Sequence, residues 1–317
     1  MTAIDSLSHY IDIITKIGAI NRSNDGGFNT LFRQFYRGHS NNTYKLLPSI
    51  ARVDTKKGRS NLNFEFYMIN RAKLRNPNEL AGINNQINLL ARLQHYGLQT
   101  RLLDITENAL VALYFACEGS PDAEGEVLVF ESASEFVVEP DMFHANAYAH
   151  FSKLIANEYT LEKFVNTLLK DNPNGLAEKV NFTNKDDVVK HLIDSRFLES
   201  NSLPLILNHE IQSEREIRQQ AAFLLFPNEY DPNSKKFKNN IVELDKNNNM
   251  IVERIIVPKS LKNELLDQLR KLGITFEFLF PEFYNRCKAI NEDVSEVYSD
   301  NADFRITLEQ ALEDFKK

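Results

Sequence analysis

The chain has few of the residues that mark secreted, metal-binding or membrane proteins. Its 317 residues include only two cysteines, Cys117 and Cys287, and no CxxC pair, so we expect neither a disulfide framework nor a structural zinc site. No apolar run approaches the roughly 20 residues of a membrane span, and the N-terminal segment lacks the basic start and unbroken apolar stretch of a signal peptide. These absences predict a cytoplasmic protein without a membrane segment.

Several common catalytic patterns are also missing. The sequence contains no GxGxxG, GxxxxGK[ST] or GxSxG motif, which argues against dinucleotide-fold, P-loop and serine-hydrolase sites. His144 and His150 are six residues apart without an acidic partner at helical spacing, so no metal is expected. Magnesium-dependent nuclease chemistry would need clustered carboxylates, and the basic part of the chain offers only Asp54, Glu65 and Glu79.

Charge is distributed unevenly along a chain of otherwise ordinary globular composition. Hydrophobic residues make up 43% and charged residues 26%, which predicts a packed core. The net charge is −7, yet Leu31 to Arg101 holds twelve Lys or Arg and three Asp or Glu, so this segment is +9 and the remainder −16. The segment either faces an anionic ligand or pairs with the acidic remainder on folding, and charge alone does not decide between them.

The pattern of apolar residues indicates a mixture of helices and strands without regular βαβ alternation, which predicts an α+β fold with a mixed or antiparallel sheet. Helices are expected over 4–19, 61–75, 83–97, 106–117 and 259–274, with Thr106 as an N-cap and Gly97 and Gly273 at helix ends. Strands are expected over 31–38, 124–132 and 217–227, and on both sides of a turn at 245–249; 100–104 is a link or short strand.

Five segments follow from these patterns. We expect an N-terminal helical segment (1–29), a first core part (30–139), a polar helical insertion (140–200), a second core part (201–290) and a C-terminal tail (291–317).

The densest chemistry lies in "LQHYGLQTRLLDITENALVALYFA", residues 93 to 116. Arg101 precedes a predicted helix N-terminus, where free N–H groups and a bidentate arginine suit a phosphate. A structural explanation is equally available, because Arg101 and Asp104 are three residues apart and can form a buried pair. His95, at a helix C-terminus, is favoured there by the helix dipole and can serve only as a cap.

This stretch, together with "FYRGHS" at 35–40, resembles the FRG domain, named for its Phe-Arg-Gly motif. The matching residues are Tyr36-Arg37-Gly38, His95-Tyr96-Gly97, Thr100 to Asp104, Thr106, Arg215, Gln219-Gln220 and Phe223, and then "IIVPKSLKNELLDQLRKLGI" and Leu279-Phe280-Pro281. The resemblance spans about residues 30 to 285. Gln99 replaces the usual Pro, Ile105 the usual Trp and Ala221 the usual Gly.

The layout is also similar to that of ADP-ribosyltransferases, which implies an ADP-ribosyltransferase-like core and NAD as substrate. The residues that this similarity implies are Arg37, His95, Arg101, Glu214, Glu216 and Gln220 for catalysis, and Tyr36, Arg37, Gly38, Tyr96 and Arg101 for NAD binding. It further implies an effector in toxin or anti-phage systems, with a nucleic-acid or protein acceptor and, for a toxin, an antitoxin partner. The alternative is a non-catalytic FRG module that binds a nucleotide or nucleic acid through the basic segment.

Overall fold

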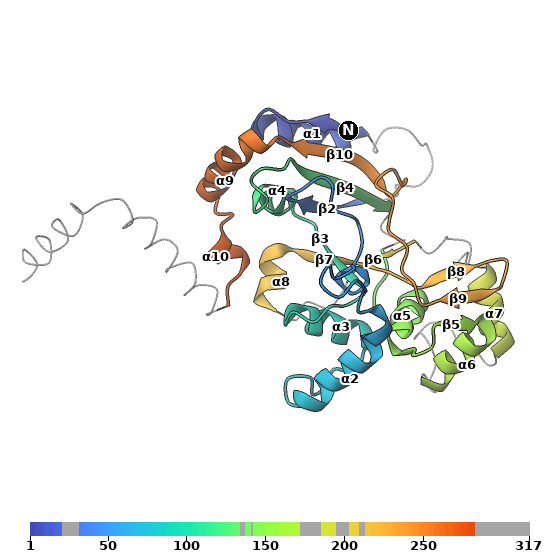
Figure 1. Ribbon diagram of the computed structural model, residues 1–317. Helices are drawn as coiled ribbons and strands as arrows, with labels where there is room; N and C mark the ends of the chain where they lie inside the picture. The colour runs from blue at the N-terminus through green and yellow to red at the C-terminus, as the bar shows by residue number, and fades with distance from the viewer. Residues whose placement is uncertain are drawn as a thin grey trace, which may run out of the picture.

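The computed structural model describes residues 1–20, 32–133, 137–140, 142–171, 185–194, 203–208 and 213–282 (Figure 1). Cys287 and the tail 291–317 lie outside the described residues. The α-helices are α1 (Leu7–Ile20), α2 (Glu65–Arg75), α3 (Gln86–His95), α4 (Ala109–Cys117), α5 (Phe143–His150), α6 (Leu161–Asp171), α7 (Lys185–Asp194), α8 (Glu214–Gln219), α9 (Lys262–Lys271) and α10 (Phe276–Leu279). Short 3₁₀ turns are η1 (Ser49–Ala51), η2 (Leu62–Phe64), η4 (Phe151–Lys153) and η5 (Lys259–Leu261).

Seven strands form the main sheet, in the order β1-β10-β4-β2-β3-β7-β6. They are β1 (Thr2–Ala3), β2 (Phe32–His39), β3 (Leu102–Thr106), β4 (Gly125–Ala133), β6 (Leu205–Leu207), β7 (Ala221–Leu225) and β10 (Ile251–Val257). Only the β1–β10 pair is parallel, so the sheet is mixed and the fold is α+β, as predicted.

The sheet divides between β2 and β3. β2 pairs with β4 from Phe32 to His39, but it pairs with β3 only at Tyr36 and Thr106. The strands diverge on leaving this point, which we call the fork. It separates an upper half-sheet (β1-β10-β4-β2) from a lower half-sheet (β3-β7-β6), and Figure 1 shows the first above the second.

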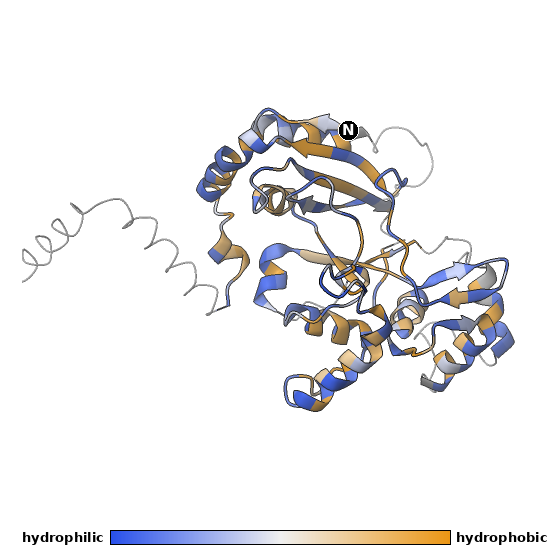
Figure 2. Ribbon diagram, in the orientation of Figure 1, coloured by the Kyte–Doolittle hydropathy of each residue, from blue (hydrophilic) through white to orange (hydrophobic). Residues whose placement is uncertain are grey.

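Three apolar clusters hold the two half-sheets and their helices together. The inner cluster lies between the half-sheets and joins residues such as Phe35 and Phe130 of the upper one to Leu103 and Leu224 of the lower one. The second packs the upper half-sheet against α1, α4 and α9. The third packs the lower half-sheet against α2, α3 and α5. Figure 2 shows hydrophobic stretches along β4 and β10 between these layers.

Helix α4 is buried, as its apolar sequence predicts, but its N-cap differs from the expected one. Asn108 caps the helix by accepting hydrogen bonds from the backbone N–H groups of Leu110 and Val111. Thr106 instead ends β3, where its hydroxyl donates to the carbonyl of Gln219 at 2.6 Å. The predicted helix therefore begins three residues later, because Leu102 to Thr106 pairs with β7.

The expected insertion at 140–200 contains α5, α6 and α7, and it also contributes a strand that we did not expect. This strand, β5 (Glu158–Thr160), pairs with β9 (Lys236–Lys238), which pairs with β8 (Glu229–Asp231) in a second, antiparallel sheet. Buried residues of α5 and α6, including Tyr148 and Phe164, share the third cluster with Leu225 of β7. The insertion is therefore packed into the core.

Two further expectations concern the C-terminal half. The described residues around the turn at 245–249 form one strand, β10, and not two, because Leu244 makes only an isolated bridge to Leu46. Gly273 has φ +84, as expected for a residue that ends a helix. Within the described ranges, no helix combines the length and apolar character that crossing a membrane requires.

Candidate functional site

The Tyr36-Arg37-Gly38 motif lies in β2, where consecutive side chains point to opposite faces. Tyr36 packs in the second apolar cluster beside α4. Gly38 lies under the same helix, and a Cβ there would come within 1.9 Å of the carbonyl oxygen of Ala112. Glycine is thus needed for the close approach of α4 to β2. Tyr36 and Gly38 were expected to bind a cofactor together with Arg37, but they face α4, on the other side of the strand.

Arg37 lies at the fork and joins β2 to β3 through its side chain. Its Nη1 donates a hydrogen bond to the backbone carbonyl of Asp104 in β3. Its Nε donates to Nε2 of His39, two residues later on the same face of β2, at 2.9 Å. Among the described residues, Nη2 of Arg37 has no partner, and the side chain is partly exposed. One edge of the guanidinium is therefore available.

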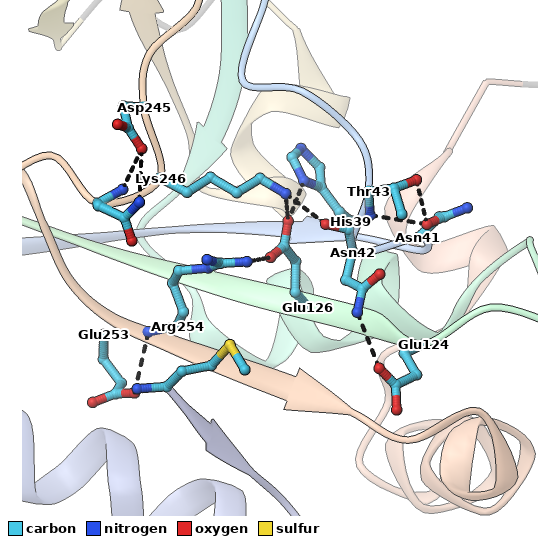
Figure 3. Close-up of polar contacts among 12 residues, drawn as sticks. His39, Asn41, Asn42, Thr43, Glu124, Glu126, Asp245, Lys246, Glu253 and Arg254 are labelled. Carbon is cyan, nitrogen blue, oxygen red and sulfur yellow. Dashed lines mark hydrogen bonds and ion pairs between the residues drawn. The ribbon is translucent and has the colours of Figure 1, made fainter.

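A buried carboxylate holds the histidine that contacts Arg37, and Figure 3 draws this carboxylate and this histidine. Oε1 of Glu126 in β4 lies 3.0 Å from Nδ1 of His39, and both side chains are buried. Since Nε2 of His39 accepts from Arg37, the proton of a neutral ring belongs on Nδ1 and is donated to Glu126. Burial is the main cause that lowers the pKa of His39 to about 4, so the ring is neutral at pH 7.

The side chains around His39 and Glu126 carry more positive than negative charge. Glu126 also accepts from Lys246 and from Nη2 of Arg254, the latter at 3.0 Å. Burial opposes ionisation of Glu126, but hydrogen bonds from His39 and Lys246 hold its pKa below 4.5. Two cations thus contact one carboxylate, and a third, Arg37, is linked to it through His39. We call this group the fork cluster: Arg37, His39, Glu126, Lys246 and Arg254.

The charge state of Arg37 fits a role toward anions. Burial lowers its pKa to about 10, the nearby Asp104 raises it, and the exposed Arg52 lowers it. The guanidinium therefore stays protonated at pH 7. Because its direct partners are an imidazole and a carbonyl, its charge is not neutralised by a carboxylate of its own.

A second group forms where α3, α8 and α10 meet. His95 ends α3, and its Nε2 lies 3.9 Å from Oε1 of Glu282. Burial lowers the pKa of His95, Arg215 lowers it further, and Glu282 and Glu216 raise it, so these charges all lie near the ring. Glu216 is only 5% exposed. Glu216, one of the late acidic residues proposed from the sequence, therefore lies near enough to His95 for its charge to raise the pKa of that histidine.

An aromatic ring borders this group. Tyr96 is 59% exposed, and its ring packs edge-on against His95 at 5.1 Å between centroids. The guanidinium of Arg92 lies 5.1 Å from the centroid of the Tyr96 ring. We call the whole group the His95 cluster: His95, Tyr96, Arg215, Glu216 and Glu282.

A short hydrogen-bond path links the two clusters. Gln94, next to His95 in α3, donates from Nε2 to Oδ1 of Asp104 at 2.8 Å. The backbone carbonyl of the same Asp104 accepts from Arg37. Asp104 thus stands between Arg37 and Gln94 with its carboxylate exposed to solvent.

Two other predicted residues stay outside the His95 cluster. Glu214 is 58% exposed and pairs with Arg218 on the same helix. Gln220 is exposed and caps α8 in the left-handed conformation, with φ 44. Its backbone carbonyl accepts from the N–H of Glu107 at 3.0 Å. The segment that we read as the start of a strand is helix α8, followed by β7.

Arg101 requires a correction. It is 0% exposed, and its guanidinium forms a bidentate pair with Glu65, with Nε 3.1 Å from Oε1. Its Nη1 donates to the carbonyl of Phe226 and to Oδ1 of Asn228, at 3.1 and 3.2 Å. The predicted role toward phosphate does not fit this arrangement, and neither does the predicted pairing with Asp104. Arg101 is a structural residue that joins β3 to α2.

Sequence reasoning missed Glu126, Lys246, Arg254 and the role of His39. A signal was available for two of them. His39 follows Arg37 by two residues in a predicted strand, and Glu126 directly precedes the apolar run Val127 to Phe130, where a buried carboxylate needs a partner. Lys246 and Arg254 reach Glu126 from a segment more than 100 residues later in the chain, and no pattern in the sequence near these residues predicts such a contact.

Comparison with known proteins returned one match. The family model of the FRG domain matches residues 33–125. No curated protein and no solved structure matches the chain, so the similarity to ADP-ribosyltransferases receives no support from these searches. The matched segment begins in β2, carries Arg37, His95 and Arg101, and stops one residue before Glu126. An FRG domain is thus identified over residues 33–125.

Proposed function

We propose that this protein is an ADP-ribosyltransferase-like enzyme that uses NAD, with the His95 cluster as its catalytic part. The observation that carries the proposal is the proximity of His95 at the end of α3 to Glu216 of α8, whose negative charge raises the pKa of the histidine. A neutral imidazole, a nearly buried carboxylate and an exposed aromatic ring are the groups that glycosidic cleavage of NAD requires.

Each of these groups has a distinct task in the proposed reaction. The bond between C1′ of the ribose and the nicotinamide nitrogen breaks, its electron pair leaves with nicotinamide, and the Glu216 carboxylate stabilises the oxocarbenium-like ribose. An acceptor nucleophile forms the new bond to C1′ and gives its proton to His95, whose lowered pKa keeps it neutral. The exposed ring of Tyr96 offers a stacking surface for nicotinamide.

The fork cluster would hold the diphosphate. Arg37 presents an unused guanidinium edge, and Lys246 and Arg254 exceed the charge of Glu126. Charge-assisted hydrogen bonds from such groups suit phosphate oxygens. Together with the family resemblance, this chemistry suggests an effector role in toxin or anti-phage systems, with an antitoxin partner if it is a toxin.

Nicotinamide release from NAD by the purified protein tests the proposal, with protein and nucleic acid supplied as acceptors. Glu216→Gln should abolish turnover while NAD binding changes little, because the carboxylate acts chiefly in the transition state. Glu214→Gln is the matched control, since Glu214 lies on the same helix but points to solvent and pairs with Arg218. It should retain turnover.

The assay also has clear contrary outcomes. If the wild-type protein leaves NAD intact with every acceptor, the enzymatic proposal is wrong. If Glu214→Gln and Glu216→Gln lose turnover equally while both remain folded by circular dichroism, Glu216 has no special place in the reaction.

The net positive charge of the fork cluster favours a second candidate, a non-catalytic module that binds a nucleotide or nucleic acid. In that case the protein would bind NAD or a single strand without turnover, and Arg37→Gln would weaken binding. The affinity for a single strand would also fall steeply with salt. The nicotinamide assay and a binding titration together separate the two candidates.

A further inference from the structure

A pocket of about 590 Å³ lies on the far side of the lower half-sheet, between α2, the start of α3, η4 and α6. It shares no residue with the fork cluster or the His95 cluster. Its size falls within the roughly 300–1,000 Å³ that is usual for small-molecule sites. The pocket brings the basic segment, through α2, against the insertion, through η4 and α6.

Among the described residues, three lysines and no carboxylate line the pocket: Lys73 from α2, Lys153 from η4 and Lys170 from α6. Burial lowers the pKa of Lys73, and the positive charge of Lys153 lowers it further, so the two ammonium groups lie near each other. In the described part of the chain, neither Lys73 nor Lys170 has an ion-pair partner. Like charges held together repel, and an anion between them would remove that cost.

Other lysines of the same region are arranged differently. Lys185 pairs with Glu162 on the neighbouring helices α7 and α6, and Lys236 pairs with Glu158 across the small sheet, at 3.1 Å. Acidic residues are therefore common around the insertion but absent from the pocket lining. This selective absence distinguishes the pocket lysines from ordinary surface charge.

The remaining lining is apolar on one part and polar on another. Phe66 and Ile69 of α2 and Leu154 after η4 supply apolar surface. Gln86 and Thr167 supply amide and hydroxyl groups, and both are held in place: Gln86 donates to Oγ of Ser152 at 2.8 Å, and Oγ1 of Thr167 lies 3.1 Å from Nε2 of His150. Such a lining fits a ligand with an anionic group and a flat, weakly polar part.

The walls are anchored by the buried arginine of the FRG segment. Glu65, the partner of Arg101, is the first residue of α2 and directly precedes Phe66. The guanidinium of Arg101 also lies 5.8 Å from the ring centroid of Phe151, which opens η4 and stacks on Phe164 of α6. One buried side chain thus contacts two walls of the pocket, α2 and η4, and the third wall, α6, stacks on the second, which favours a preformed site.

We propose that this pocket binds a nucleoside phosphate, with its phosphates on Lys73, Lys153 and Lys170 and its base against Phe66, Ile69 and Leu154. The site is separate from the one proposed for NAD and does not depend on it. A nucleoside phosphate is the ligand class that matches both the lysines and the apolar surface within this volume.

Isothermal titration calorimetry with ADP as the probe tests the proposal, with pyrophosphate and adenosine titrated in parallel. The titrations use Arg37→Gln protein, so that the fork cluster contributes little. ADP should bind more tightly than either fragment. Adding Lys73→Gln and Lys170→Gln should weaken ADP binding at least tenfold, whereas adding Lys190→Gln, an exposed lysine of α7 outside the pocket lining, should change the affinity by less than twofold.

Each other outcome overturns the proposal or a defined part of it. If ADP does not bind, or if the Lys73 and Lys170 changes have no more effect than the Lys190 control, the pocket is not a nucleoside phosphate site. If pyrophosphate binds as tightly as ADP, and Phe66→Leu affects neither, the pocket recognises the anion alone and the nucleoside assignment is wrong. NAD turnover, measured on the wild-type background, reports separately on the proposed function.

Discussion

Arg37 and Arg101 are both arginines of the FRG segment, yet they occupy opposite kinds of environment. Arg101 is fully buried, and a carboxylate, a carbonyl and an amide engage its guanidinium. Arg37 is partly exposed, and within the described part of the chain it donates only to a neutral imidazole and a carbonyl, with no partner for Nη2. The comparison shows that two arginines of one segment can have different roles. The hydrogen-bond acceptors distinguish the roles: the guanidinium of Arg101 meets a carboxylate, and that of Arg37 does not.

The largest expected effect concerns Arg101. Arg101→Ala leaves Glu65 buried without its partner, so the free energy of unfolding should fall by about 3–5 kcal/mol. Urea unfolding followed by circular dichroism measures this loss. The double change Arg101→Met with Glu65→Leu should recover much of the stability, because it removes both charges. A loss below about 1 kcal/mol in Arg101→Ala would contradict the structural role.

A pH effect of intermediate size tests the support behind Arg37. The pKa of His39 is about 4 in the folded protein and 6.5 as a free side chain, so the unfolded chain binds more protons between these values. The free energy of unfolding should therefore be highest above pH 6.5 and fall as pH drops toward 4, by on the order of 3 kcal/mol at most. Urea unfolding at a series of pH values measures the slope.

His39→Gln is the matched variant for this pH effect, because its amide can accept from Arg37 and donate to Glu126 without titrating. The slope between pH 6.5 and 4.5 should flatten in this variant. The lowered pKa of Glu126 also makes the free energy of unfolding fall as the pH drops at the acid end of the series. The slope there therefore does not separate His39 from Glu126. An unchanged slope would assign the pH dependence to other groups, such as His95.

The smallest effect on stability, but a clear one on binding, is expected for Arg37 itself. Arg37→Gln should cost little stability, because it leaves no buried carboxylate without a direct partner. It should nevertheless weaken the binding of a diphosphate ligand such as ADP-ribose by about 1.5–3 kcal/mol. Titration calorimetry on wild type and variant measures the difference. Arg59→Gln, an exposed arginine of the same basic segment, should bind as the wild type does. If Arg37→Gln unfolds instead, the contrast with Arg101 disappears.

Much of the fold was predictable, because local signals were strong. The apolar sequence of Val111 to Cys117 predicted a buried helix, and the left-handed Gly97 and Gly273 marked helix ends. Thr106 was assigned wrongly, since it can cap a helix or end a strand and the pairing with β7 decided the outcome. The segment 214–220 was misread because its short helix depends on the Ser213 cap and the Gln220 end.

The candidate site was less predictable, because long-range contacts define it. The sequence nominated Arg37, His95 and Glu216, which carry charge within recognisable motifs. It also nominated Arg101, because nothing near Arg101 in the chain reveals that Glu65 lies under it. The ion pairs of Lys246 and Arg254 with Glu126 join β4 to the segment that includes β10. These residues come together only when the sheet has folded.

The fork has a practical consequence for anyone who expresses the matched segment 33–125 by itself. Within the full chain, β2 is covered by β4 and β3 is covered by β7, and both covering strands, apart from Gly125 of β4, lie outside that segment. A truncated product would retain two hydrogen-bonding strands whose outer edges are bare and flanked by apolar faces. Such edges recruit other chains and lead to aggregation. The FRG segment is therefore a recognisable stretch of sequence but not an autonomous folding unit.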